Sequence, residues 1–183
     1  MKKFDVKKTL AVFLVSIMAA LLAGIYGMIH DHISYSISNE YYTKYRFLQY
    51  GLVNEDGDRI IHPRVFVSLI AFFSTWWLPF ISGVVFGFFN LIQSSWKKLF
   101  QTSFVAIMIA VLITIISELI GLFLGIIFLS KLSKSFFVDW CFIPDNLQHF
   151  ENYIAVGSMD IFSFIGGIIG LVLGIFYSYK KRS

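Results

Sequence analysis

Four long apolar stretches divide the chain. Each is long enough to cross a bilayer as a helix, because roughly 20 helical residues span the hydrocarbon core. The stretches cover about residues 10–29, 65–92, 103–129 and 161–179. They contain one charged residue between them, Glu118, and Asp160 directly precedes the fourth. The pattern predicts an all-α membrane protein, a bundle of four transmembrane helices that forms a single domain over residues 1–183.

The connection over residues 30–64 carries a different pattern. The stretch "ISYSIS", residues 33–38, alternates apolar and polar residues, which is the period of a strand with one buried face. The following "SNEYYTKYRFLQYG" changes to a helical period. Ser38 is a suitable N-cap and Gly51 a suitable C-terminal stop for that helix. We expect a short strand and then an amphipathic helix that lies against the membrane surface.

The connection over residues 130–160 has a similar organisation. Its stretch "FFVDWCFI" is typical of a strand, and "PDNLQHFENYI" predicts the start of a helix. Asp145 would be the N-cap of that helix, and Gln148 stands at the capping-box position. We therefore expect the two connections to form a small α+β cap over one end of the bundle.

Small residues recur at four-residue spacing in the predicted spans. Gly166, Gly170 and Gly174 lie on one face of the fourth span, and such faces let helix backbones approach closely in lipid. We expect these faces to pack the bundle internally, and association of two copies through one of them is the alternative. Pro79 predicts a kink in the second span. Trp77 lies nearer the middle of that span than an aromatic belt requires, which indicates that it packs inside the bundle or lines a cavity.

The composition agrees with a membrane protein. Hydrophobic residues make up 57% of the chain and charged residues 14%, whereas soluble domains average about 45–50% and about 25%. The single cysteine, Cys141, excludes an intrachain disulfide and any zinc site built from a cysteine pair.

The distribution of basic residues predicts the orientation. Nine of the 15 lysines and arginines lie in the N-terminal segment, in the short link between spans two and three, and in the C-terminal segment. Because cytoplasmic segments carry the excess of positive charge, we expect a multi-pass protein of the bacterial inner membrane with both termini in the cytoplasm and the two long connections outside. The positive charge stays next to the span ends, so no nucleic-acid partner is expected.

The first apolar stretch also has features of a secretory signal. Its apolar run covers about 20 residues, which is longer than the roughly 7–15 residues of the apolar core of a secretory signal. An uncleaved membrane anchor is therefore the favoured interpretation.

Several stretches together resemble a family of small bacterial four-span membrane proteins. They are "HDHISYSISNEYYTKYRFLQYGL", "TWW", "IPDNL" and "IAVGSMDIFSFIGGIIG". The usual forms in the family are similar to H-D-x-I-S/T-Y-x-x-S-x-E-Y-F/Y-T-K and V-G-S/T-x-H-N-F-S-Y-x-G-G. The residues that match the first pattern include His30, Asp31, Glu40, Tyr41, Thr43 and Lys44. Asp160 and Ile161 stand where the second pattern has histidine and asparagine, so a role of that histidine would pass here to a carboxylate. The resemblance implies the fold and the membrane location, and it implies no activity.

Four ligand-type residues lie within eleven positions at the end of the first span: His30, Asp31, His32 and Glu40. Imidazole and carboxylate groups suit a divalent transition metal such as Zn²⁺, Mn²⁺ or Fe²⁺. The alternative is a structural role, in which His30 and Asp31 cap the first span and tie the two connections together by hydrogen bonds.

Glu118 lies near the centre of the third span, where a charged side chain is unfavourable by about 2.5–3.5 kcal/mol. It must face the bundle interior, as a protonated or a paired group. One interpretation is an ion or proton relay that joins Glu118 to Asp160, with Trp77 at a cavity beside them. The other is a neutral carboxyl that forms an interhelical hydrogen bond.

These candidates leave three classes of function open. The favoured one binds or relays an ion or small ligand between the helix bundle and the cap. The others are a structural or partner-binding membrane subunit and a metal-dependent membrane enzyme. The expected partners are the lipid bilayer and either a second copy or another membrane protein. The sequence has no G-x-S-x-G motif and no phosphate-binding glycine loop, so neither hydrolase nor nucleotide chemistry is indicated.

Overall fold

A computed structural model describes residues 5–52, 62–137 and 142–182 of the protein. In this part of the chain, four helices are long and apolar enough to cross a membrane. They cover Val6–Ile37, Pro63–Ile92, Trp96–Lys131 and Phe150–Lys180. The predicted all-α membrane bundle is therefore confirmed, and the chain is a multi-pass membrane protein.

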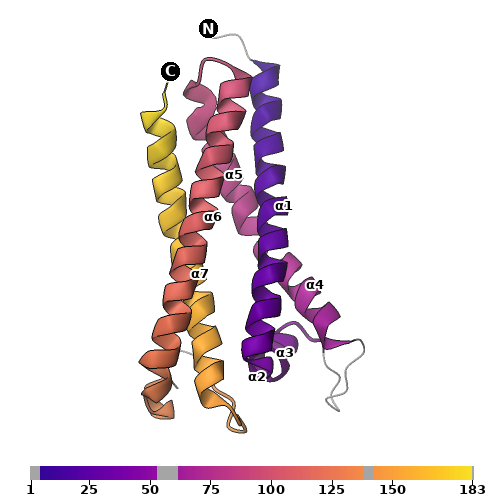
Figure 1. Ribbon diagram of the computed structural model, residues 1–183. Coiled ribbons are helices and arrows are strands. Elements are labelled where there is room, and N and C mark those ends of the chain that lie inside the picture. Colours follow the sequence, from indigo (N-terminus) through magenta and orange to yellow (C-terminus); the bar gives the residue numbers. More distant parts are fainter. Residues whose placement is uncertain (1–4, 53–61, 138–141, 183) are drawn as a thin grey trace.

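Each predicted span is longer in the structure, and the second is divided. The elements are α1 (Val6–Ile37), α2 (Asn39–Tyr41), the π-helical turn η1 (Tyr42–Arg46), α3 (Phe47–Gln49), α4 (Pro63–Thr75), α5 (Trp77–Phe89), η2 (Asn90–Ile92), α6 (Trp96–Ile127), η3 (Leu129–Lys131), η4 (Lys134–Phe136) and α7 (Phe150–Lys180). Both termini lie at one end of the bundle (Figure 1), which we call the terminal end. The opposite end, with α2 and α3, is the loop end.

The predicted α+β cap is not supported, because the described residues contain no strand. Residues 33–37 continue α1 as helix, so the prediction of a strand there is wrong. Serine explains the error: Ser36 Oγ donates to the carbonyl of His32, one helical turn earlier, over 2.9 Å. Serine thus fits a helix as well as the polar face of a strand. The strand-like stretch 136–143 falls partly outside the described residues.

The helical segment after α1 has the predicted ends. Ser38 Oγ accepts a hydrogen bond from the backbone N–H of Tyr41 over 3.3 Å. Gly51 has a φ of 64°, in the left-handed region that glycine adopts without strain. The Gly51 N–H donates to the Leu48 carbonyl, and the next N–H, of Leu52, donates to the carbonyl of Phe47. These two bonds are the Schellman arrangement that ends a helix.

The second span breaks where proline predicted a kink. Pro79 has no N–H to donate to the carbonyl of Thr75, and its ring crowds that carbonyl. Accordingly α4 ends at Thr75 and α5 begins at Trp77. The break separates two 13-residue helices that both pack against α1.

The helices pack mainly as two pairs, α1 with α4 and α5, and α6 with α7, as Figure 1 shows for the second pair. A β-carbon on Gly170 of α7 would lie 2.7 Å from Cα of Ala110 in α6. A β-carbon on Gly83 of α5 would lie 2.6 Å from Cα of Ser16 in α1. Both glycines therefore allow backbone contact that any other residue would prevent, which confirms that these faces pack the bundle internally.

Candidate functional site

A cavity of about 350 Å³ lies between the two helix pairs. Its walls come from α1, the junction of α4 and α5, α6 and α7, and we call it the central cavity. Most of its lining is apolar, with scattered hydroxyl groups. The charged and imidazole side chains that line it are His30 and Asp31 of α1, Arg46 of η1 and Asp160 of α7. Trp77, which was expected to pack inside the bundle or to line a cavity, is among the lining residues.

The polar side chains at this place form one connected group, which we call the acid cluster. Its members are Tyr26, His30, Asp31, Tyr41, Arg46, Glu118 and Asp160. The structure thus brings together four residues that the sequence singled out in two sets, His30 and Asp31 of α1 with Glu118 of α6 and Asp160 of α7.

His30 is the centre of the acid cluster. Its Nδ1 lies 2.9 Å from Oδ1 of the adjacent Asp31. Its Nε2 lies 3.5 Å from Glu118 Oε2 and 3.8 Å from Asp160 Oδ1. The side chain of His30 is only 7% exposed. One buried imidazole therefore faces three carboxyl groups on three helices.

Two tyrosines hold the outer carboxyl groups of the acid cluster. The hydroxyl of Tyr26 donates to Glu118 Oε2, and the hydroxyl of Tyr41 donates to Asp160 Oδ2 over 2.8 Å. Tyr26 stands four residues before His30, so both side chains leave α1 on the same face, with their ring centres 6.0 Å apart. The phenols fix the orientation of the carboxyl groups toward His30.

Three polar atoms of the acid cluster lack a hydrogen-bond partner within the described part of the chain. They are Nε2 of His30, Oδ2 of Asp31 and Nε of Arg46. A buried polar atom without a partner is unfavourable by about 1–3 kcal/mol. All three residues line the central cavity, so a bound ion, proton donor or ligand there would meet three groups that are ready to interact.

The acid cluster has more acids than bases. Three carboxyl groups face one permanent cation, Arg46, and one titratable imidazole, His30. Burial lowers the pKa of Arg46, but the negative charge of Asp160 and the neighbouring Tyr41 and Asp31 more than offset this, so that the pKa is raised and the guanidinium stays charged. At least one carboxyl group is therefore in excess, and in a buried site that excess favours uptake of a proton or a cation.

The four residues of the predicted metal site are not assembled. His32 points to α4, where its Nε2 lies 2.9 Å from Ser68 Oγ. The carboxylate of Glu40 lies at the loop end, where it forms an ion pair with Lys44. In residues 5–52, 62–137 and 142–182, no group of three or more histidine, cysteine, aspartate or glutamate side chains is placed to hold a metal ion. Only His30 and Asp31 of the four belong to the acid cluster.

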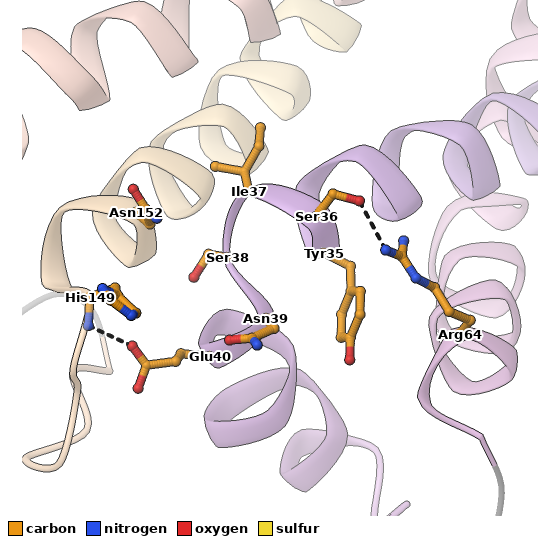
Figure 2. A pocket seen from close by; sticks show the side chains of 9 residues that line it. All are labelled: Tyr35, Ser36, Ile37, Ser38, Asn39, Glu40, Arg64, His149 and Asn152. Carbon is orange, nitrogen blue, oxygen red and sulfur yellow. Dashed lines mark hydrogen bonds between the residues drawn. The ribbon is translucent and has the colours of Figure 1, made fainter.

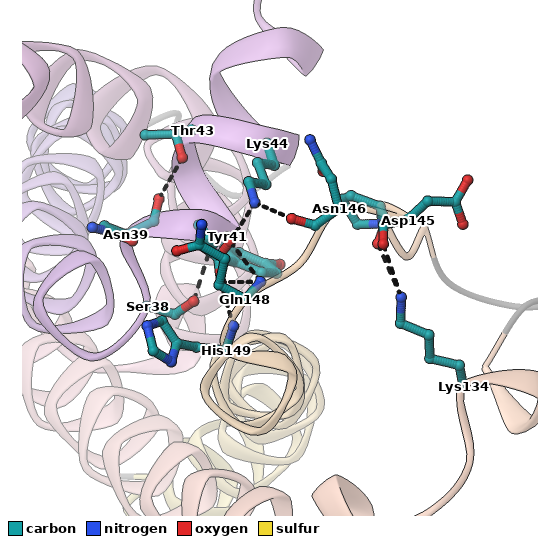
Figure 3. A network of polar contacts seen from close by, with 12 residues as sticks. Ser38, Asn39, Tyr41, Thr43, Lys44, Lys134, Asp145, Asn146, Gln148 and His149 are labelled. Carbon is teal, nitrogen blue, oxygen red and sulfur yellow. Dashed lines mark hydrogen bonds and ion pairs between the residues drawn. The ribbon is translucent and has the colours of Figure 1, made fainter.

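Glu40 instead caps the approach to α7. Its carboxylate accepts hydrogen bonds from the backbone N–H groups of Gln148 and His149, the latter over 2.7 Å, and pairs with Lys44. Figure 3 shows Lys44, Gln148 and His149 close together at this place, with Lys44 also donating to the carbonyl of Asn146. Burial alone raises the pKa of the Glu40 carboxyl, but the Lys44 ammonium and the two N–H groups overcome this and lower it to about 2. The predicted N-cap Asp145 does not start α7, which begins at Phe150.

A second, more polar pocket of about 360 Å³ lies beside Glu40 at the loop end. Figure 2 shows that its charged groups are already engaged: Arg64 donates to Ser36 Oγ over 3.0 Å, and the His149 N–H donates to Glu40. Residues of α1, α4 and α7 line this pocket at the loop end. Because its charged groups already have partners, it is a weaker candidate for a binding site than the central cavity.

Three members of the acid cluster were missed from the sequence: Tyr26, Tyr41 and Arg46. Tyr26 could have been found, because a tyrosine four residues before His30 in an apolar helix shares its face. Tyr41 and Arg46 lie in the segment after α1, and the direction of their side chains depends on how that segment folds back onto α7.

Comparison with protein-family models, with curated proteins and with solved structures finds no match to this chain. The functional inference therefore rests on the geometry of the acid cluster and of the central cavity.

Proposed function

We propose that this protein binds a proton or small cation at the acid cluster and relays it between the central cavity and the loop end. One observation carries the proposal: the partnerless Nε2 of buried His30 lies between the carboxyl groups of Glu118 and Asp160, at 3.5 and 3.8 Å. These separations are longer than a direct hydrogen bond. A proton or cation shared among the three groups would relieve the excess of acid.

The cluster supplies a continuous order of groups for such a relay. It runs from Tyr26 and Glu118, in the middle part of the bundle, through His30 to Asp160 and Tyr41 near the loop end. Carboxyl, imidazole and phenol groups can each accept and give up a proton. Each neighbouring pair lies within 4 Å, so small movements of the side chains would bring a donor to its acceptor.

The proposal includes the location in the bacterial inner membrane, with both termini in the cytoplasm. The lysine-rich segments at the terminal end support it, because positive charge accumulates on the cytoplasmic side. Lys8 illustrates the placement: its ammonium donates to the carbonyl of Leu91, 3.2 Å away, at the link between the second and third spans. In this orientation the acid cluster lies toward the outer face.

Proton movement into proteoliposomes tests the relay. A potassium diffusion potential drives the flux, and a trapped pH dye reports it. Glu118→Gln keeps the shape of the neutral acid and can still accept from Tyr26, but it cannot exchange a proton. We expect this variant to fold and its flux to fall to that of empty liposomes. Glu151→Gln, which removes an exposed carboxyl from the start of α7, is the matched control and should keep the wild-type flux.

Two outcomes would overturn the relay. Full wild-type flux in Glu118→Gln would show that this carboxyl carries no proton. Absence of flux in the wild type, together with a lower melting temperature only in Glu118→Leu, would make the acid cluster a structural network. The chain would then fit the class of partner-binding membrane subunits, because no movement of ions would remain to be explained.

A further inference from the structure

The central cavity extends well beyond the acid cluster, and its apolar part reaches the surface of the bundle. Trp77 of α5 and Phe164 of α7 both line it, yet they are 49% and 57% exposed. Ala19, Phe86 and Ile107, on the inner walls, are nearly fully buried. The cavity therefore opens between α5 and α7.

This opening faces the lipid rather than water. Trp77 lies near the middle of the span Pro63–Ile92, and Phe164 lies near the middle of the span Phe150–Lys180. Residues at mid-span are surrounded by hydrocarbon in the bilayer. A molecule that enters here must first dissolve in the membrane, so it must carry a large apolar part.

The charge of the acid cluster selects the polar part of such a molecule. Asp31, Glu118 and Asp160 outnumber Arg46 and His30 even when His30 is protonated, so one further cation balances the site, whereas an anion would add to the excess of negative charge in a buried place. Bringing like charges together there is strongly unfavourable. Aromatic side chains on the walls, Tyr26 and Trp77 among them, also favour a cation, since their ring faces attract positive charge.

We propose that the central cavity binds an amphipathic organic cation that enters from the bilayer between α5 and α7. Its positive charge lies toward Asp160 and Asp31, and its apolar groups pack along Trp77 and Phe164. The inference rests on the proposed function, because the bound charge takes the place of the relayed proton or small cation. The cavity volume of about 350 Å³ is at the lower end of the range for small-molecule sites, roughly 300–1,000 Å³, which suits a compact monovalent cation.

Tetraphenylphosphonium is a suitable probe, because tetraphenylborate has nearly the same shape and the opposite charge. Binding of both is measured by equilibrium dialysis against protein in lipid nanodiscs, with empty nanodiscs as the blank for partition into lipid. We expect saturable binding of the phosphonium and only the blank value for the borate. Asp160→Asn should weaken the affinity for the phosphonium by about tenfold or more, because it removes one negative charge from the site. Each factor of ten corresponds to about 1.4 kcal/mol.

Two further variants test the proposal without changing a residue of the acid cluster. Trp77→Ala changes the rim of the cavity alone, and loss of one aromatic contact to a cation should weaken binding by about two- to fivefold. Glu151→Gln removes an exposed carboxyl from the same helix as Asp160 and should bind as the wild type does. Melting temperatures show which variants are folded.

Equal saturable binding of the borate, wild-type affinity in both Asp160→Asn and Trp77→Ala, or absence of saturable phosphonium binding would each overturn the inference. The flux experiment separates this failure from that of the relay. Flux that depends on Glu118 without phosphonium binding would leave a site for protons or small ions only. Phosphonium binding without flux would leave a cation site that relays nothing.

Discussion

The hydroxyl of Tyr41 donates a hydrogen bond to Asp160 Oδ2 over 2.8 Å, and this bond joins the segment after α1 to α7. The ring of Tyr41 also packs edge-on against Tyr153, with centroids 5.2 Å apart. Asp160 is thereby oriented by a residue 119 positions earlier in the chain. The carboxyl oxygen that remains, Oδ1, is the one that faces His30.

Tyr41→Phe should remove this bond and little else, because phenylalanine keeps the ring packing. We expect a loss of about 1 kcal/mol in the free energy of unfolding and weaker phosphonium binding, since Asp160 loses its orientation. Chemical unfolding in detergent and equilibrium dialysis measure the two effects. Tyr45→Phe, on the neighbouring ring, is the control. Equal losses of stability and of phosphonium binding in Tyr41→Phe and Tyr45→Phe would show that the hydrogen bond between Tyr41 and Asp160 makes no specific contribution to either.

Gly170→Ala should loosen the contact between α6 and α7. The new β-carbon would lie 2.7 Å from Cα of Ala110, and backbone cannot move aside as a flexible side chain can. We expect a loss of roughly 1–3 kcal/mol, as for other overpacked interiors. Gly167→Ala is the matched control, because its β-carbon would meet only Thr114 Oγ1, at 3.8 Å. Melting temperatures of the two variants that agree within error would contradict close packing at Gly170.

Glu40 should make stability depend on acid pH. Its pKa in the folded protein is about 2, below the reference value of 4.5. Its stabilising contribution is therefore fully present above pH 4.5 and is lost as the pH falls from there toward 2. Unfolding measured through this range should show the loss in the wild type and a smaller one in Glu40→Gln. That variant should also be less stable at neutral pH by about 2 kcal/mol, as expected for bonds to a charged group. Identical pH profiles for wild type and variant would argue against the cap.

Labelling of single cysteines should establish the orientation. In a Cys141→Ser background, Ser94→Cys lies at the terminal end and Ser135→Cys at the loop end, and both serines are exposed. With both termini in the cytoplasm, a membrane-impermeant maleimide should label Ser135→Cys in intact cells and label Ser94→Cys only after lysis. The reverse pattern would invert the proposed topology.

The parts of the fold that follow from local rules were predictable. Apolar length identified the spans, and Pro79 marked the break, since both depend on residues close together in the sequence. The acid cluster was only partly predictable. His30 and Asp160 stood out as polar residues at span ends, but their meeting depends on how α1 packs beside α7. The start of α7 was misplaced for a similar reason: Glu40, from a distant segment, binds the backbone N–H groups of Gln148 and His149, just before α7, where the sequence predicted a helix capped by Asp145.

The pairing of the helices also determines the order in which the site is completed during synthesis. α1 packs with α4 and α5, and α6 packs with α7, so each pair can close as soon as its own residues have emerged. The acid cluster takes His30 from the first pair and Asp160 from the last helix. These charged groups are therefore synthesised at different times, and the excess of carboxyl groups over basic groups arises only when the second helix pair docks on the first. A pulse-labelled chain truncated before α7 should already hold α1 and α4 together, and cross-linking of His32→Cys to Ser68→Cys with a short bifunctional maleimide would detect it, since these two side chains meet at 2.9 Å.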